Sequence, residues 1–309
     1  MYFNSFPFYP QTRKPYIYDT SIAEIIIICS VTACTFIIIL PGIRGKLRLF
    51  WLLRVLTSLL IGAVILAVNF TRDWEVGMVT TTTVYKSFSK EMVNVSIGLW
   101  VGLKGINITL SGIPLHQINE TINYNEIFDW ETGEKFDKEY AEGLERGLPN
   151  PILYVAEKFT SGSPGRLYEQ YSIGSHYASA LMWLAFCSWI FCNVLFSMLL
   201  LQYGIYMMIS TSLCVIISLI SFVSFRQEAC SIIFGISVLQ PTLGLSFWLS
   251  LGAGILCLML SLILIVLHIR KPTILKRVFN DIDAAKKISE SEEVLFLDDN
   301  QTIMLQQML

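Results

Sequence analysis

Five long apolar segments alternate with polar stretches along the chain. Each is long enough to cross a bilayer as a helix, which takes about 20 predominantly apolar residues. The apolar sequence from Tyr177 to Phe225 is too long for one span and is interrupted only at Gln202-Tyr203-Gly204, so we expect two helices there. The pattern predicts a polytopic α-helical membrane protein whose five transmembrane helices lie at 22–40, 49–70, 177–201, 203–225 and 245–269.

The composition agrees with a membrane protein. Hydrophobic residues make up 54% of the chain and charged residues only 15%, which is not the balance of a soluble domain. The net charge of −2 does not indicate a nucleic-acid partner, because the charges are segregated between different loops.

The basic residues set the expected orientation. Arg44, Lys46 and Arg48 lie in the short connection between the first two spans, and Arg270 and Lys271 follow the fifth span at once. Short basic connections stay in the cytosol. We therefore expect an extracellular N-terminal arm at 1–21, a cytosolic connection at 41–48, extracellular segments at 71–176 and 226–244, and a cytosolic tail at 270–309.

Three Asn-x-Ser/Thr sequons in the long 71–176 segment support the same orientation independently. They begin at Asn94, Asn107 and Asn119. Such sequons are glycosylated only on the lumenal or extracellular side, so we predict N-glycans at these three residues.

Periodicity predicts a folded domain in this segment. Apolar residues alternate with polar ones over 93–101 and again over 106–111, which indicates a β-hairpin with one buried face, and Val76–Tyr85 is a plausible third strand. A helical pattern follows, with Phe136, Tyr140 and Leu144 on one face. A second helix is expected from Asn150-Pro151, with the apolar residues Ile152, Val155, Ala156 and Phe159 on one face.

Trp74 and the sequence Gly98-Leu99-Trp100 are similar to the first-loop signature of claudins. Claudins continue this signature with a cysteine pair, whereas here Leu103 stands where the first cysteine would come and the whole segment contains no cysteine. The similarity implies a claudin-like β+α extracellular domain between helices 2 and 3. It does not extend to junction-forming chemistry.

No pattern for catalysis or cofactor binding occurs in the sequence. Between Arg72 and His176 there are 9 Lys/Arg and 14 Asp/Glu, a net charge of −5 that predicts an acidic surface, but no spacing singles out an acid/base pair. The three histidines, His116, His176 and His268, are not paired on facing helices as haem ligation requires. We expect a protein that is not an enzyme and holds no metal or cofactor of its own.

Two residues have alternative interpretations. Arg54 lies about one turn into the second span, where it either reaches back to the headgroups or acts as a charge in an ion pathway or partner contact. Cys230 is the one cysteine in a hydrophilic setting, whereas the other six lie in apolar runs. It is either an intermolecular disulfide partner or a free thiol near the bilayer edge.

Long strings of this sequence resemble the dual oxidase maturation factors, the DUOXA family. The strongest is LPGIRGKLRLFWLLRVLTSLLIGAVILAVNF at Leu40–Phe70, supported by Phe6-Pro7-Phe8-Tyr9, by NETINYNE at Asn119–Glu126 and by GLPNPILYVAEKFT at Gly147–Thr160. The resemblance covers nearly the whole chain up to the fifth span. Gly165 departs from it, since some members have a cysteine there.

The resemblance implies a non-catalytic five-span partner of a dual oxidase. Such a partner escorts the oxidase from the endoplasmic reticulum to the plasma membrane and supports hydrogen peroxide production. It also implies that haem, FAD and NADPH belong to the oxidase, and that Cys230 bonds the oxidase's outer domain. The alternatives are a claudin-like adhesion or junction protein and a channel auxiliary subunit.

Overall fold

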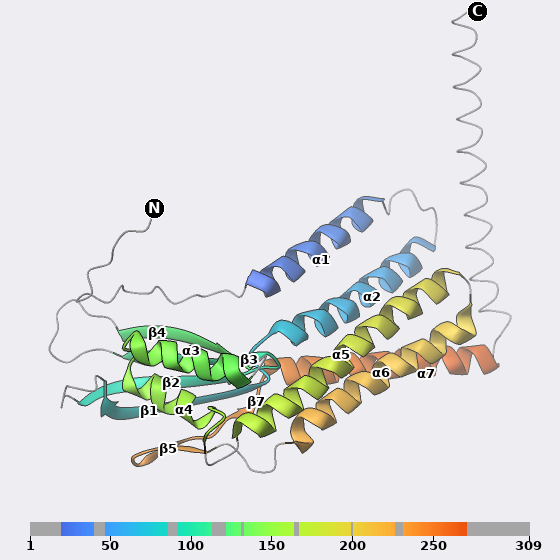
Figure 1. Cartoon of the computed structure of the whole chain (residues 1–309). Helices are drawn as coiled ribbons and strands as arrows, with labels where there is room; N and C mark the ends of the chain where they lie inside the picture. Colours follow the sequence, from blue (N-terminus) through green and yellow to red (C-terminus); the bar gives the residue numbers. More distant parts are fainter. Residues whose placement is uncertain are drawn as a thin grey trace, which may run out of the picture.

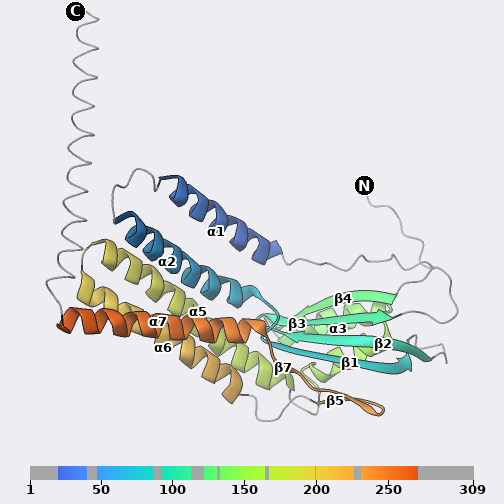
Figure 2. The same cartoon turned by 180° about the vertical axis from the view of Figure 1, so that it is seen from behind.

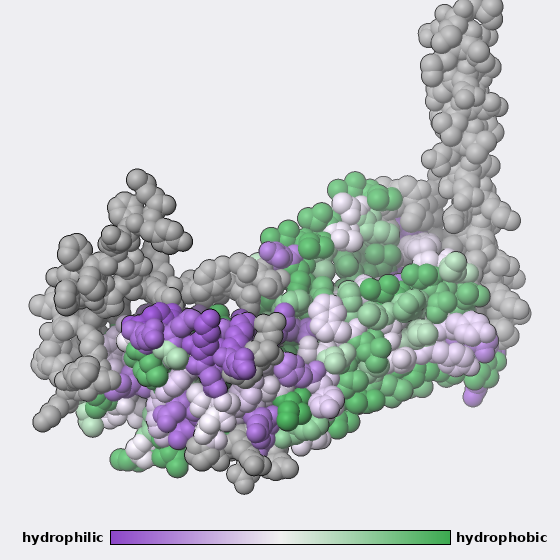
Figure 3. Space-filling view, in the orientation of Figure 1, coloured by the Kyte–Doolittle hydropathy of each residue, from purple (hydrophilic) through white to green (hydrophobic). Residues whose placement is uncertain are grey.

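The computed structural model describes residues 20–39, 47–85, 92–112, 122–130, 133–163, 167–198, 200–225 and 231–270. These residues form a bundle of long helices and, at one end of it, a smaller sheet domain (Figure 1). Apolar surface gathers over the bundle, whereas hydrophilic side chains gather over the sheet domain (Figure 3). An apolar surface this extensive suits lipid rather than water.

Five helices of the described part are long and apolar enough to cross a membrane, which confirms the predicted number of spans. α5 and α6 pack along each other, and α7 packs against both α6 and α2. α1 packs along α2 at the edge of the bundle and leaves most of its apolar side chains exposed (Figure 2). The five are α1 (Thr20–Ile39), α2 (Leu47–Phe70), α5 (Leu167–Ser197), α6 (Leu201–Ser224) and α7 (Leu245–Arg270).

α5 is longer than a bilayer requires. It begins at Leu167, ahead of Tyr177 where the third span was expected, and its 31 residues rise about 46 Å, against about 30 Å of hydrocarbon. Tyr171 is buried in the core of the sheet domain, and Leu167 and Tyr168 pack against that core. The first turns of α5 therefore belong to the sheet domain and fix it to the bundle.

The sheet is antiparallel, with the strand order β4-β3-β2-β1-β7. The predicted hairpin is confirmed, with Val101 of β2 opposite Ile106 of β3, and the predicted third strand pairs with it as β1. β7 joins the edge from the segment just before α7, which ties the fifth span to the sheet. The strands are β1 (Glu75–Val84), β2 (Met92–Val101), β3 (Gly105–Gly112), β4 (Ile122–Asp129) and β7 (Thr242–Leu243).

Two short helices, α3 (Gly133–Glu145) and α4 (Asn150–Lys158), cover one face of the sheet. The predicted inner face of α4 is confirmed, with Ile152, Val155 and Ala156 fully buried. The prediction for α3 is right for Phe136 but wrong for Leu144, which is 51% exposed. Seven residues complete two helical turns, so Gly143 rather than Leu144 returns to the face of Phe136.

The opposite face of the sheet carries no helix of the described part (Figure 2). Beside β1 lies a small hairpin that the sequence did not predict, made by β5 (Ile232–Phe234) and β6 (Ser237–Leu239). Its Ile232, Phe234 and Leu239 join the domain core, while Ile236 at its tip is fully exposed. Gly235 makes the tight turn with a φ of 59°.

Candidate functional site

Asn94 lies on the open face of the sheet, as the alternation of β2 predicted. Its side chain is exposed, and its neighbour across the strand pair is Thr82 of β1. The flanking residues Val93 and Val95 point the other way and are buried. A glycan attached at Asn94 would extend from the sheet without displacing the core.

Asn107 is on the same face but in a more enclosed position. In register it lies between Trp100 of β2 and Ile127 of β4. Its Oδ1 atom is buried and has no hydrogen-bond partner among the described residues. The two predicted glycosylation sites of the sheet thus share a face and differ in their surroundings.

The other two predicted site residues, Asn119 and Cys230, lie outside the described residues, as do the N-terminal arm and Gly165. In the sequence, Cys230 stands two residues before β5. The six cysteines of the described residues all carry free thiols. They are Cys29, Cys34, Cys187, Cys192, Cys214 and Cys257.

Trp74 is the central residue of the junction between the sheet domain and the bundle. It is completely buried, and its ring centroid lies 5.0 Å from that of Phe222 on α6 and 6.3 Å from that of Phe247 on α7. Its indole Nε1–H donates to the carbonyl of Val68 on α2 at 3.0 Å. Its backbone N–H donates to the carbonyl of Val101 at the end of β2. One residue therefore links three membrane helices and the sheet.

Polar contacts surround this aromatic centre. The Ser246 hydroxyl at the start of α7 donates to the Asp73 carboxylate and lies 2.6 Å from the Thr71 hydroxyl. The guanidinium of Arg72 is 3.0 Å from the carboxylate of Asp129 at the end of β4. Such contacts satisfy the polar groups that a close approach of domain and bundle would otherwise leave without partners.

Asp129 is also the point where α3 is attached. Its backbone N–H donates to the carboxylate of Glu139 at 2.9 Å. Burial raises the pKa of Glu139, and the hydrogen bond from Asp129 offsets part of that shift. This carboxylate thus has a fixed structural partner.

A second polar network joins the middle of α2 to the last turns of α5, in the half of the bundle that is remote from the sheet domain. The hydroxyl of Ser58 donates to Oδ1 of Asn193 at 2.5 Å, and Nδ2 of Asn193 donates to the carbonyl of Trp189 at 2.8 Å. The indole of Trp189 completes the network by donating to the carbonyl of Ser58 at 3.1 Å. Arg54 lies beside it, with its guanidinium 5.1 Å from the ring of Trp51 and 5.8 Å from that of Phe196.

Neither network has the arrangement that catalysis requires. In the described part of the chain no group of three His, Cys, Asp or Glu residues could hold a metal ion. The polar side chains of the junction are engaged with one another. This geometry is suited to holding a sheet domain rigidly on a membrane bundle.

The fold and the junction define a class: an integral membrane protein with five spans, whose sheet domain follows the second span and packs back on the three later ones. The model of the dual oxidase maturation factor family matches residues 8–282. The chain therefore belongs to the dual oxidase maturation factor family, which confirms the resemblance seen in the sequence. It is a non-catalytic accessory protein.

Several relatives support the assignment over most of their length. Dual oxidase maturation factor 1 of Xenopus laevis is 60% identical over 294 residues, which cover 94% of this chain and 95% of the relative. The human factor 1 is 50% identical, covering 90% of this chain and 81% of its own. The human dual oxidase maturation factor 2 is 44% identical, covering 92% and 88% respectively.

Sequence reasoning missed most of the residues that build these contacts. The sequence marked Trp74 only through its similarity to claudins. It did not distinguish Asn193, which is a single polar residue within an apolar span. A single Asn in a membrane helix is costly unless it has a partner, so it was a usable signal. The partner itself, Ser58, could not be identified from the sequence.

Proposed function

We propose that this chain is a maturation factor and lasting partner of a dual oxidase, needed for the oxidase to leave the endoplasmic reticulum, reach the cell surface and produce hydrogen peroxide. The observation that carries the proposal is 60% identity to a dual oxidase maturation factor over 94% of this chain. Identity over that length includes both the bundle and the sheet domain. Haem, FAD and NADPH would then belong to the oxidase.

The architecture supports a binding role. The exposed apolar side chains of α1, such as Ile38 at 75% exposure, are available to lipid or to the helices of a partner. On the other side of the junction, the open face of the sheet and the β5–β6 hairpin are available to the part of a partner that lies outside the membrane. A partner that binds only the folded oxidase stabilises it by mass action, which favours passage through quality control.

The proposed orientation places the N-terminus and the sheet domain outside the cytosol, and the C-terminal tail inside it. The basic connection at 41–48 and the three sequons support this orientation. Cys230 would then face an oxidising compartment, where it could form a disulfide with the oxidase.

The test is to express a dual oxidase, with and without this chain, in cells that lack an endogenous maturation factor. Surface biotinylation measures oxidase delivery, and a cell-impermeant probe measures extracellular hydrogen peroxide. We expect both to rise only when the chain is present. If delivery is unchanged by a well-expressed chain, the function is wrong, and a junction protein that associates with copies of itself becomes the better hypothesis.

The disulfide is tested separately with Cys230→Ser on a non-reducing gel. The matched control is Cys34→Ser, which removes an exposed cysteine from α1 within the predicted first span. Loss of a mixed-disulfide band in Cys230→Ser alone would support the assignment. A band that persists in Cys230→Ser would overturn it without affecting the test of delivery.

A further inference from the structure

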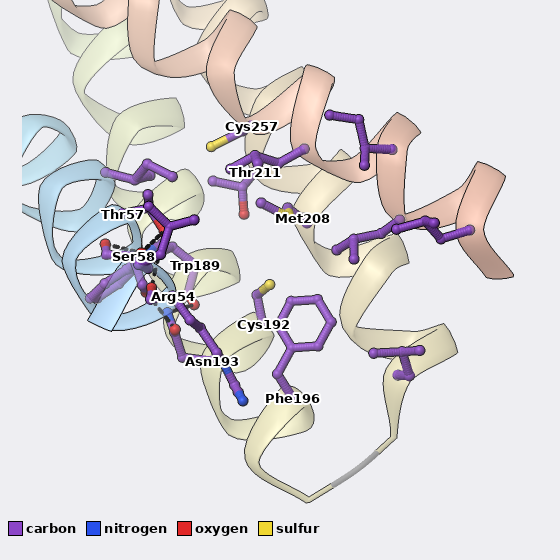
Figure 4. Close-up of a pocket in the computed structure, with 17 residues that line it drawn as sticks. Arg54, Thr57, Ser58, Trp189, Cys192, Asn193, Phe196, Met208, Thr211 and Cys257 are labelled. Atoms are coloured by element: carbon purple, nitrogen blue, oxygen red, sulfur yellow. Dashed lines mark hydrogen bonds between the residues drawn. The ribbon is translucent and has the colours of Figure 1, made fainter. Parts of the chain in front are cut away.

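A cavity of about 360 Å³ lies between four helices of the bundle, α2, α5, α6 and α7 (Figure 4). Its volume falls at the lower end of the range for ligand pockets, about 300–1,000 Å³. Most of its lining is apolar, including Phe196 of α5, Met208 of α6 and Leu264 of α7. Its occupant must therefore offer mainly hydrocarbon to these walls.

The cavity extends over one half of the membrane. Along α7 its lining extends over ten residues, from Cys257 to Leu267, and stops close to the end of the helix at Arg270. At 1.5 Å per residue that distance is about 15 Å, half of a hydrocarbon core of about 30 Å. On α2 the lining starts at Leu53 and Arg54, close to the beginning of the helix at Leu47. The space thus matches the depth of a single leaflet.

Arg54 provides the polar end. Its described contacts are the rings of Trp51 and Phe196, and no described carboxylate lies within ion-pair distance of it. Ser58 and Asn193, which also line the cavity, already bond to each other. A guanidinium at this depth is stabilised when it meets an anion at the headgroup level, and its planar donors suit a phosphate.

We propose that this cavity binds one acyl chain of an anionic phospholipid from the leaflet at that end, with the lipid phosphate at Arg54. Hydrocarbon fills the space between the four helices and restores the packing contacts that a void would lack. The net negative charge of an anionic headgroup supplies what the cavity walls do not, whereas in phosphatidylcholine the choline cation offsets the phosphate. A sterol fits the apolar part but offers only a hydroxyl to the guanidinium.

Lipid binding is tested on the full chain in nanodiscs, without any oxidase. The probes are phosphatidylserine and phosphatidylcholine that carry a photoreactive group on one acyl chain, with a photoreactive sterol as a third arm. Labelled peptides are mapped by mass spectrometry. We expect labelling around Met208 and Cys257, with phosphatidylserine favoured about fivefold over phosphatidylcholine.

Two variants should separate the preference for an anionic headgroup from the binding of the acyl chain. Arg54→Gln should abolish the preference for phosphatidylserine, whereas Arg54→Lys should retain it. Leu264→Trp, which fills the cavity, should abolish labelling of its lining by every probe. Arg48→Gln is the matched control, because Arg48 is exposed near the start of the same helix and does not line the cavity.

Size-exclusion profiles and glycan patterns like those of the unaltered chain show that each variant is folded. Equal labelling by both phospholipids, labelling that survives Leu264→Trp, or labelling of the lining by the sterol alone would each overturn the proposal. Because no oxidase is present, none of these outcomes bears on the maturation function.

Discussion

The hydroxyl of Tyr171 on α5 donates a 2.8 Å hydrogen bond to the carboxylate of Glu75 at the start of β1. Both side chains are almost completely buried, at 3% and 1% exposure. The tyrosine ring also stacks on Trp130, with 6.2 Å between the ring centroids. The contact therefore joins the longest membrane helix to the first strand through a buried ionisable group, which is costly unless it is well partnered.

We predict that Tyr171→Phe lowers the stability of the protein. The substitution keeps the ring and removes a donor to a buried carboxylate, which costs about 1.5–3 kcal/mol. Thermal unfolding in detergent, followed by near-ultraviolet circular dichroism, measures the change. The matched control is Tyr154→Phe, because Tyr154 is partly exposed and its hydroxyl makes only a long bond of 3.3 Å to the carbonyl of Ile233. Equal midpoints for the two variants would contradict the prediction.

The pH dependence of the α3 attachment follows from Glu139. Because burial raises the pKa of Glu139 in the folded protein, the folded state favours its protonated form. The contribution of this group to stability is therefore highest below its unfolded pKa and falls as pH rises through the folded pKa.

We predict that Glu139→Gln is more stable than the unaltered chain at pH 7 and that the difference shrinks as pH falls toward 4. Glutamine can still accept the N–H of Asp129 but carries no charge to desolvate. The measurement is the difference in unfolding midpoint between the two proteins across this range. Glu142→Gln, an exposed position on the same helix, is the control and should show no such trend. A difference that does not vary with pH would contradict the assigned cause.

The sequence predicted those parts of the fold that have a strong hydrophobic period. The five spans and the β2–β3 hairpin are of this kind. β4 was missed because its inner face includes Glu126, which is buried with the guanidinium of Arg146 at 3.5 Å, so apolar and polar positions do not alternate. The first turns of α5 were missed because Glu169 and Gln170 make them look like part of a polar loop.

The candidate sites were less accessible to sequence reasoning. Asn94 and Asn107 have the same period-two position. They differ because Asn94 lies just beyond the paired part of β2 and β3 and has a strand neighbour only on β1, whereas Asn107 has one on each side. The cavity depends on how four helices pack against one another. These helices are apolar on all sides, so no periodicity indicates which residues face the space.

The glycosylation prediction is tested through the hydroxyl of each sequon, which leaves the asparagine in place. Ser96→Ala should remove the glycan at Asn94, and Thr109→Ala the glycan at Asn107. Each should shift the band on a gel by one step, because the oligosaccharide transferase needs the hydroxyl residue of the sequon. Thr121→Ala applies the same test to Asn119.

The matched controls are Ser96→Thr and Thr109→Ser, which keep the sequons. Treatment with a glycosidase should bring every variant to the same mobility. If the unaltered chain does not respond to the glycosidase, the predicted glycans are absent and the proposed orientation loses its independent support.

The last prediction concerns the turn where β7 enters α7. A Cβ atom built on Gly244 would collide with the backbone carbonyl of Asp73, which cannot move without disturbing Trp74. The backbone N–H of Gly244 donates to the carbonyl of Trp74 at 2.7 Å, so this close approach is part of the junction. We predict that Gly244→Ala costs about 1–3 kcal/mol or more through overpacking.

The comparison is with Gly252→Ala on α7, where a Cβ atom would meet nothing within 4 Å. There the substitution should be neutral or should stabilise the helix by about 0.5–1 kcal/mol, because alanine loses less conformational entropy than glycine. Limited proteolysis of the sheet domain and the unfolding midpoint, both on the isolated chain, measure the effects. If Gly244→Ala leaves both unchanged, the sheet domain does not depend on this junction for its attachment to the fifth span.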